Sequence, residues 1–226
     1  MKRLETDALW TAIDDYFNDL LVPPEPALDA ALQATEEAGL PPINVAPNRG
    51  KLLMLLARTL GATRILEIGT LGAYSTIWLA RGLAPDGRLI TLEWNPACAK
   101  VARANLARAG LASQVEVRDG RAEDILPELT AEAPFDLIFI DADKPNTPLY
   151  FQWAVKLARK GSLIIVDNVV REGAILEQDS GAADVQGMRR FFELAASEPR
   201  VSGTALQTVG TKGHDGLAIL LVTGEA

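Results

Sequence analysis

The sequence predicts an α/β protein with a doubly wound, mostly parallel seven-stranded sheet, an antiparallel C-terminal hairpin and extra N-terminal helices. Three observations lead to this prediction. From Arg64 onward short β-branched segments alternate with amphipathic ones, the first of them ends in a glycine-containing turn, and the last two are joined by a short connection. The alternation is typical of right-handed β-α-β crossovers, which build a parallel sheet covered on both faces. The short connection predicts an antiparallel pair.

The first sixty residues are predicted to be helical. Apolar residues recur with a helical period in residues 6–20, and Pro23 and Pro24 then stop the pattern. Further helices are expected at residues 26–38 and 51–60, each followed by a glycine, whereas the proline-rich segment 40–50 is expected to be irregular. We therefore expect a single domain over residues 1–226, with residues 1–60 as a helical cap on a Rossmann-like core, residues 61–226.

The core elements follow in alternation. Strands are predicted at residues 64–69, 88–93, 114–119, 135–141 and 162–168. Helices are predicted at residues 74–82, 96–109, 122–129, 149–158 and 185–196. Segments 200–208 and 217–222 form the predicted hairpin, and His214 is expected to be a loop residue in the connection between them.

The composition predicts a compact soluble protein, with 48% hydrophobic and 23% charged residues. With 22 basic and 30 acidic residues the net charge is −8, so we expect neither nucleic acid nor a membrane surface as partner. Cys98 and His214 are the only residues of their types, so any metal should have oxygen ligands. Glu5 and Asp7 do not fit a secretory signal, and no apolar segment is long enough to span a bilayer, so we expect a cytoplasmic location.

The turn after the first predicted strand is expected to bind a nucleoside-like ligand. Gly69 and Gly72 follow the strand directly, where backbone N–H groups can approach a ligand. The spacing lacks the second glycine of the dinucleotide pattern, because Leu71 stands in its place. Glu93 ends the next strand, where an acidic side chain can accept hydrogen bonds from ribose hydroxyls.

Two aspartates end neighbouring predicted strands. Asp141 and Asp167 each follow an apolar run, and paired strands lie about 4.8 Å apart, so both carboxylates could share one cation. Asn168 adds an amide oxygen, and such a donor set suits a hard divalent ion such as Mg²⁺. Lys144 follows in the loop over the same edge and is a candidate general base.

These segments together resemble a known enzyme family. LEIGTLGAYS, the strand end at Glu93, GRAED, IDADK and VDN resemble the divalent-metal-dependent O-methyltransferases of the catechol and caffeoyl-coenzyme A type, particularly the bacterial members. The resemblance extends from about Ile43 to the C-terminus, and IDADK and VDN are its most specific parts. Thr147 replaces the first tyrosine of the plant-type pattern, so the shape of the plant acceptor pocket does not carry over.

The resemblance implies S-adenosylmethionine as cofactor. The implied cofactor-binding residues are Val45, Glu67, Gly69, Thr70, Ser75, Glu93, Ala122 and Asp141. Val45 would close over the methionine end, Glu93 would accept from the ribose hydroxyls and Ala122 would line the adenine pocket. The implied metal ligands are Asp141, Asp167 and Asn168, with Mg²⁺ as the first choice and Mn²⁺ or Ca²⁺ as alternatives. Lys144 falls on the position of the catalytic lysine, and Asp141 is assigned to catalysis with it.

The implied reaction is methyl transfer from S-adenosylmethionine to a hydroxyl of a small, catechol-like aromatic acceptor chelated to the metal. A homodimer is also expected, because the N-terminal helices add apolar surface. Other readings stay open: a methyltransferase for another small-molecule or amine acceptor, an NAD(P)-dependent oxidoreductase, and a binding module without chemistry. The oxidoreductase would need the dinucleotide glycine spacing. A nucleic-acid amino-methylating enzyme would need an Asn/Asp-Pro-Pro-aromatic motif and a basic face, which the sequence lacks.

Overall fold

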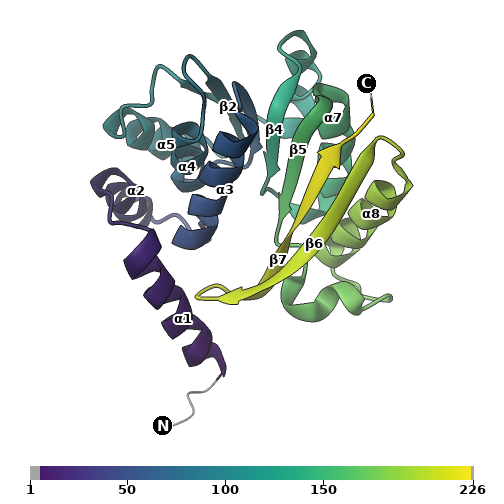
Figure 1. The fold of residues 1–226 in the computed structure, drawn as a ribbon, viewed down its shortest axis with the longest axis horizontal. Coiled ribbons are helices and arrows are strands. Elements are labelled where there is room, and N and C mark those ends of the chain that lie inside the picture. The colour runs from purple at the N-terminus through teal and green to yellow at the C-terminus, as the bar shows by residue number, and fades with distance from the viewer. Residues whose placement is uncertain (1–5, 225–226) are drawn as a thin grey trace.

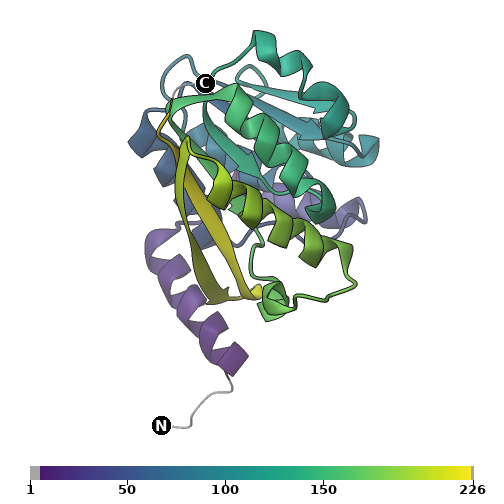
Figure 2. The same ribbon diagram turned by 90° about the vertical axis from the view of Figure 1, so that its right-hand side faces the viewer.

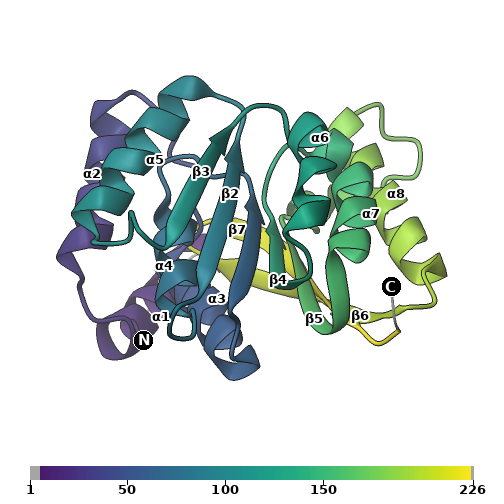
Figure 3. The same ribbon diagram turned by 90° about the horizontal axis from the view of Figure 1, so that it is seen from above.

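One seven-stranded sheet with helices on both faces forms the body of the protein (Figures 1 and 3). The structure is a computed structural model that describes residues 6–224. Residues 1–5, including Glu5, and residues 225–226 lie outside the described part, so the predicted domain bounds are described only between residues 6 and 224.

The sheet has the strand order β3-β2-β1-β4-β5-β7-β6. The strands are β1 (Arg64–Ile68), β2 (Arg88–Glu93), β3 (Val115–Asp119), β4 (Phe135–Ile140), β5 (Ala158–Asp167), β6 (Val201–Gly210) and β7 (Gly213–Val222). The first five strands pair in parallel, whereas β7 runs antiparallel to both β5 and β6. The predicted fold class is confirmed, including the antiparallel C-terminal hairpin.

The helices divide between the two faces of the sheet. They are α1 (Thr6–Leu21), α2 (Pro26–Glu37), α3 (Pro47–Leu60), α4 (Tyr74–Arg81), α5 (Pro96–Arg108), α6 (Ala122–Ile125), α7 (Thr147–Leu157) and α8 (Ala183–Ser197), with 3₁₀ turns η1 (Glu128–Ala131), η2 (Lys144–Asn146) and η3 (Arg171–Leu176). Side chains of α2 to α5 pack on one face, and those of α6 to α8 pack on the other. Both faces are therefore covered, as a doubly wound sheet requires.

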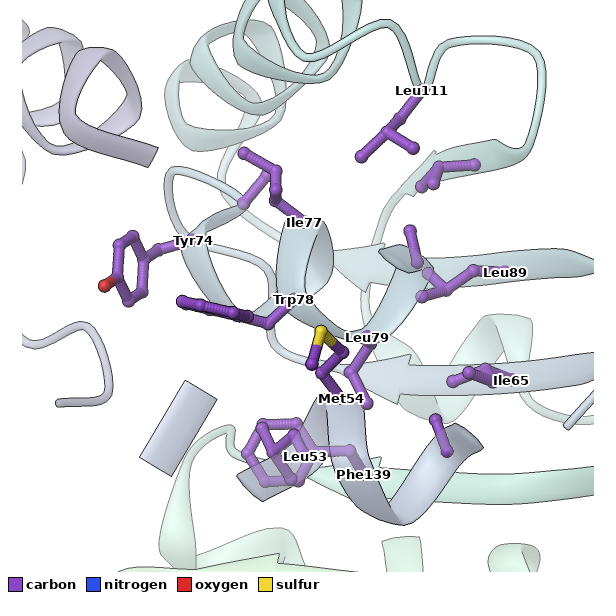
Figure 4. Packing of buried hydrophobic residues seen from close by; sticks show 14 of the residues in the cluster. Leu53, Met54, Ile65, Tyr74, Ile77, Trp78, Leu79, Leu89, Leu111 and Phe139 are labelled. Atoms are coloured by element: carbon purple, nitrogen blue, oxygen red, sulfur yellow. The ribbon is translucent and has the colours of Figure 1, made fainter. Parts of the chain in front are cut away.

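The strand residues alternate between two cores. Ile65 and Leu89 point to the face of α3 and α4, where Leu53, Trp78 and Phe139 complete the packing shown in Figure 4. Their chain neighbours, such as Leu66 and Ile90, belong to the core on the other face. Because adjacent strand residues point to opposite faces, two covered faces require apolar residues at nearly every position. The central strand β4 is accordingly buried along its whole length.

Several boundaries differ from the sequence prediction; strand β5, for example, begins at Ala158 rather than at residue 162. Helix α3 begins at Pro47 rather than at residue 51, because a proline at the first helical position lacks only an N–H that would be unpaired there. Helix α6 ends at Ile125, before Pro127, and a separate 3₁₀ turn follows. The hairpin strands continue to Gly210 and Gly213, so the expectation that His214 is a loop residue is wrong: it pairs with Val209 in the ladder.

Helix α1 stands apart from the two cores. Figures 1 and 2 show it beside the tip of the β6–β7 hairpin. The buried Asp14 carboxylate joins the two elements, accepting hydrogen bonds from Asn48 Nδ2 at 2.8 Å and from the backbone N–H of Thr211 at 3.0 Å. The outer face of α1 exposes Leu9, Ile13, Tyr16, Phe17, Leu20 and Leu21.

Within residues 6–224, the structure contains no helix with the length and apolar character needed to cross a membrane.

Candidate active site

A cavity of about 1180 Å³ lies at the carboxyl edge of β1, β2, β4 and β5. The proline-rich loop, the start of α3 and the tip of the hairpin form the rest of its wall. Its lining includes the predicted site residues Val45, Gly69, Thr70, Ser75, Glu93, Ala122, Asp141, Lys144, Asp167 and Asn168. This volume exceeds the usual range of about 300–1,000 Å³ for a small-molecule site, so it has room for more than one small ligand.

The glycine turn is pressed against the end of β4. Gly69 has a φ of +99°, and a Cβ atom there would lie 2.2 Å from the carbonyl oxygen of Asp141. A side chain at this position would therefore meet both backbone strain and a clash with backbone atoms. Glycine at this turn is what lets the ends of β1 and β4 approach each other.

The N–H groups of the turn mostly have acceptors within the protein. Gly69 donates to the carbonyl of Leu92 at 3.0 Å. The Glu93 carboxylate accepts from Thr70 N at 3.2 Å and Leu71 N at 2.8 Å through Oε2, and from Asn95 N at 2.9 Å through Oε1. A carboxylate has about four acceptor positions, so one on Oε1 remains. The turn thus orients an acidic side chain rather than offering the row of free N–H groups that would bind a pyrophosphate.

Glu67 does not line the cavity, and neither does Gly72 of the predicted turn, which lies against Thr35 of α2. Glu67 lies on β1, is completely buried, and accepts hydrogen bonds from Ser75 Oγ at 2.7 Å, Thr91 Oγ1 at 2.7 Å and Thr76 Oγ1. Burial raises the pKa of this carboxyl from its usual 4.5 to about 7, although the three hydroxyl hydrogen bonds act in the opposite direction. Glu67 therefore lies beneath the cavity wall and reaches it through Ser75.

The two strand-end aspartates meet at one edge of the sheet, as predicted. Strands β4 and β5 pair in parallel up to Ile140 and Val166, so Asp141 and Asp167 follow at the same level. Asp167 is almost completely buried, and burial together with the neighbouring Asp141 carboxylate raises its pKa to about 6, while Arg49 acts to lower it. Two carboxylates so close together, one of them buried, favour a cation between them.

The loop after β4 places a lysine at this edge. Lys144 Nζ donates to Asp141 Oδ1 at 2.9 Å, and the side chain is mostly buried. Asp143 instead accepts from Tyr150 Oη at 2.6 Å and Asn146 Nδ2 at 2.6 Å, which supports the loop from within. The loop also packs against α8, where a Cβ atom at Gly187 would lie 2.2 Å from the Lys144 carbonyl oxygen.

The sequence analysis missed one charged residue at this edge. Arg49, in the first turn of α3, pairs through Nη1 with Asp167 Oδ1 and through Nη2 with Thr208 Oγ1 of β6. It was missed because the helix was expected to begin only at residue 51. A signal existed: a basic residue is unfavourable near the positive end of a helix, so an arginine two residues after Pro47 needs an acidic partner.

Trp94 and Cys98 also line the cavity. Trp94 follows Glu93 and leaves 74% of its surface exposed, so it is not part of the core. Cys98 is buried, and burial is the main cause of a raised thiol pKa. Among the described residues, 6–224, no three His, Cys, Asp or Glu side chains are grouped as metal ligands; the candidate set contains two carboxylates and the Asn168 amide.

Comparison with known proteins gives a consistent result. A sequence profile described as O-methyltransferase matches residues 23–220. A catechol O-methyltransferase of Niastella koreensis is 51% identical over 216 residues, which cover 95% of this chain and 98% of that protein. A catechol O-methyltransferase of Mycobacterium tuberculosis is 53% identical over 210 residues, covering 93% and 94%.

Two solved structures show the same similarity. An O-methyltransferase from Bacillus cereus in complex with SAH has a TM-score of 0.95 and 54% identity, covering 96% of this chain and all of that one. TomG from Streptomyces achromogenes, involved in tomaymycin synthesis and solved in complex with SAM, has a TM-score of 0.95 and 52% identity, covering 98% and 100%.

The chain belongs to the O-methyltransferase family, as the resemblance implied. It is an enzyme of the same fold as these bacterial relatives along nearly its whole length. Family membership decides against the oxidoreductase and against a module without chemistry.

The buried Glu67 carboxyl predicts a pH-dependent stability. Because its pKa is about 7 in the folded protein and 4.5 ordinarily, the unfolded chain loses this proton first, and stability falls as the pH rises from 4.5 through 7. Glu67→Gln removes the titration. As the pH rises from 4.5 to 8, the free energy of unfolding of the variant should increase by up to about 3 kcal/mol relative to that of the wild type. Urea denaturation at each pH measures this difference.

Glu116→Gln is the matched control. Glu116 is exposed, and Arg118 lowers its pKa, so its removal should bring no gain at high pH. If the difference in free energy of unfolding between Glu67→Gln and the wild type does not change with pH, the raised pKa of Glu67 is contradicted.

Proposed function

We propose that the enzyme transfers a methyl group from S-adenosylmethionine to a hydroxyl of a small, catechol-like aromatic acceptor held by a divalent cation. The observation that carries this proposal is that Asp141 and Asp167 end adjacent strands and line the same cavity as the glycine turn and Glu93. One cavity thus combines a nucleoside-type turn with a pair of carboxylates. The names of the catechol O-methyltransferase relatives support the acceptor class.

The cofactor would lie along the ends of β1 and β2. In this proposal Oε1 of Glu93 accepts from a ribose hydroxyl, since that oxygen has one acceptor position left. Val45 and Ala122 both line the cavity wall and would contact the methionine and adenine ends. Gly69, Thr70 and Ser75 would border the centre of the cofactor, with Glu67 holding the Ser75 hydroxyl. The relatives solved with SAH and SAM support this cofactor.

The donor set fits a divalent cation. Asp141 and Asp167 supply two carboxylates and Asn168 an amide oxygen, all hard ligands of the kind that Mg²⁺ prefers, with Mn²⁺ and Ca²⁺ as alternatives. The buried Asp167 has a raised pKa partly because Asp141 lies near it, and a cation relieves that repulsion. When bound, the metal would lower the pKa of an acceptor hydroxyl and orient a vicinal diol.

The chain's own residues have two tasks in the reaction. The cavity must align the acceptor oxygen with the methyl carbon, because displacement at a sulfonium is in line, and such alignment can lower a barrier by about 7–11 kcal/mol. Lys144 would take the proton of the acceptor hydroxyl on Nζ. Since Nζ donates to Asp141 in this structure, and Asp141 is also a proposed metal ligand, Nζ must first release a proton to solvent while the Asp141 carboxylate orients it. Asp141 therefore acts with Lys144 in catalysis as well as binding metal.

We propose that residues 1–226 form a single methyltransferase domain, with residues 1–60 as a cap on the core of residues 61–226. The cap contributes Val45 to the cavity wall, so the site is complete only when both parts are present.

We also propose a homodimer in which the apolar face of α1 packs against a second copy. A two-fold interface of this kind uses the same patch on both subunits.

Gly69→Ala should weaken binding of S-adenosylhomocysteine at least about tenfold. The added Cβ would push the turn away from Asp141 and shift the Glu93 carboxylate that the turn holds. Gly61→Ala is the matched control, because Gly61 also has a positive φ, +63°, but nothing lies within 4 Å of its Cβ position. Calorimetry checks both variants, and equal affinity in wild type and Gly69→Ala would refute the proposed place of the cofactor.

Metal removal should separate cofactor binding from methyl transfer. The proposed cofactor contacts lie mainly at the ends of β1 and β2, whereas the metal ligands end β4 and β5. In the presence of a chelator the enzyme should still bind S-adenosylhomocysteine but lose transfer to a catechol, and added Mg²⁺ should restore it. Undiminished transfer in chelator would rule out the metal.

Lys144→Ala should lower turnover without lowering Mg²⁺ affinity, whereas Asp167→Ala should lower Mg²⁺ affinity. Loss of the proposed base should reduce turnover by about 10²- to 10⁴-fold, with partial recovery at higher pH. Mg²⁺ affinity should not fall in Lys144→Ala, because the change removes a positive charge beside Asp141. Asp167→Ala removes a ligand, so Mg²⁺ affinity should fall, and excess metal should restore part of the rate. Turnover and calorimetric affinity are measured in parallel.

The control for this pair is Lys160→Ala, which removes an exposed lysine from β5. A loss below about tenfold in Lys144→Ala would show that Lys144 is not the base. Wild-type metal affinity in Asp167→Ala would show that the strand-end pair is not the metal site.

Light scattering of the wild type at micromolar concentration should give the mass of two chains, as the proposed homodimer requires. The double change Tyr16→Glu and Leu20→Glu places charges on the exposed face of α1 and should give a monomer. Leu176→Glu, at an exposed apolar residue of η3, should leave the mass unchanged. A monomeric wild type would count against the proposal.

A further inference from the structure

Arg49 joins three separate parts of the chain at the edge of the cavity. It lies in the first turn of α3, and its guanidinium contacts Asp167 at the end of β5 and Thr208 on β6. The arginine side chain is 16% exposed and the aspartate side chain 2%. The ion pair is therefore largely removed from solvent, where screening by salt is weak.

The charges at this edge balance without a metal ion. Asp167 pairs with Arg49, and Asp141 pairs with Lys144 at 2.9 Å. Each of the two carboxylates proposed as metal ligands thus already has one cationic partner. A divalent ion bound to both carboxylates would add two positive charges to a site that is already neutral, next to two fixed cations.

The two cations are held differently. Lys144 belongs to η2, whose backbone packs directly against Gly187 of α8, and its loop is supported by hydrogen bonds to Asp143. The guanidinium of Arg49 has two partners, Asp167 and the hydroxyl of Thr208. A basic residue in the first helical turn also gains nothing from its own helix, because the helix N-terminus is the positive end. Lys144 lies three residues from Asp141 in the same supported loop, whereas Arg49 reaches Asp167 from a separate helix, so Arg49 is the cation that can move away from its carboxylate.

We propose that Arg49 occupies Asp167 in the metal-free enzyme and competes with the divalent cation for this carboxylate. The guanidinium neutralises a buried carboxylate whose other partner at Oδ1 is the uncharged backbone N–H of Asn168, and it leaves Oδ1 of Asp167 when the metal binds. Arg49 therefore sets the metal affinity through a contact that the metal must break. This inference rests on the proposed metal site.

Binding of Mn²⁺ to Arg49→Gln tests the competition directly, with free Mn²⁺ measured by electron paramagnetic resonance at low ionic strength. The variant loses the charge but retains a polar side chain, and it should bind Mn²⁺ at least about tenfold more tightly than the wild type. Arg58→Gln is the matched control, since Arg58 lies on the same helix and donates only to the carbonyl of Arg81. The control should match the wild type.

The outcomes separate this inference from the metal site itself. Equal or weaker Mn²⁺ binding in Arg49→Gln, with binding still lost in Asp167→Asn, would overturn the competition and leave the metal site standing. Absence of Mn²⁺ binding in both wild type and Arg49→Gln would overturn the metal site and the competition together.

A measurement on the wild type covers the case in which the variant does not fold. On titration of ¹⁵N-labelled enzyme with Mg²⁺, the Nε–H resonance of Arg49 should shift as the guanidinium leaves Asp167, while that of Arg58 should stay in place. An Arg49 resonance that is unchanged at saturating Mg²⁺ would overturn the proposal.

Discussion

The parallel pairing of β4 with β1 and β5 is the constraint on which the site depends. This pairing brings the carboxyl ends of three strands to one edge, so that Gly69, Asp141 and Asp167 meet although they are far apart in the chain. The absence of a side chain at Gly69 lets the turn approach the Asp141 backbone closely. Apolar strands buried on both faces pack between the two helical layers and hold this edge in place.

Electrostatics at this edge follows from burial. A carboxylate as buried as Asp167 needs a cationic partner, and a second carboxylate nearby strengthens that need. In this structure Asp167 pairs with Arg49 of α3, and Asp141 pairs with Lys144 of the loop after β4. The same property makes the pair suitable for a divalent ion, so charge balance within the protein and the proposed metal site draw on the same carboxylates.

The side of the cavity at the ends of β1 and β2 is organised by hydrogen bonds instead of ion pairs. Three backbone N–H groups fix the Glu93 carboxylate, and three hydroxyls surround Glu67 beneath the wall. These groups orient acceptors before any ligand arrives, which reduces the ordering cost of binding. The proline-rich loop that carries Val45 forms another part of the cavity wall.

Local pattern in the sequence was sufficient for the sheet, its antiparallel end and the strand-end residues Glu93, Asp141 and Asp167, because strand periodicity and chain order determine which residues reach the carboxyl edge. It was not sufficient for Arg49, which lies 118 residues from Asp167 and on a helix turn that Pro47 begins. Nor did it reveal that Glu67 lies beneath the cavity wall or that the hairpin strands extend past His214. These features depend on which surfaces pack together, and only the tertiary structure decides that, since burial and charge pairing act between segments that no local pattern connects.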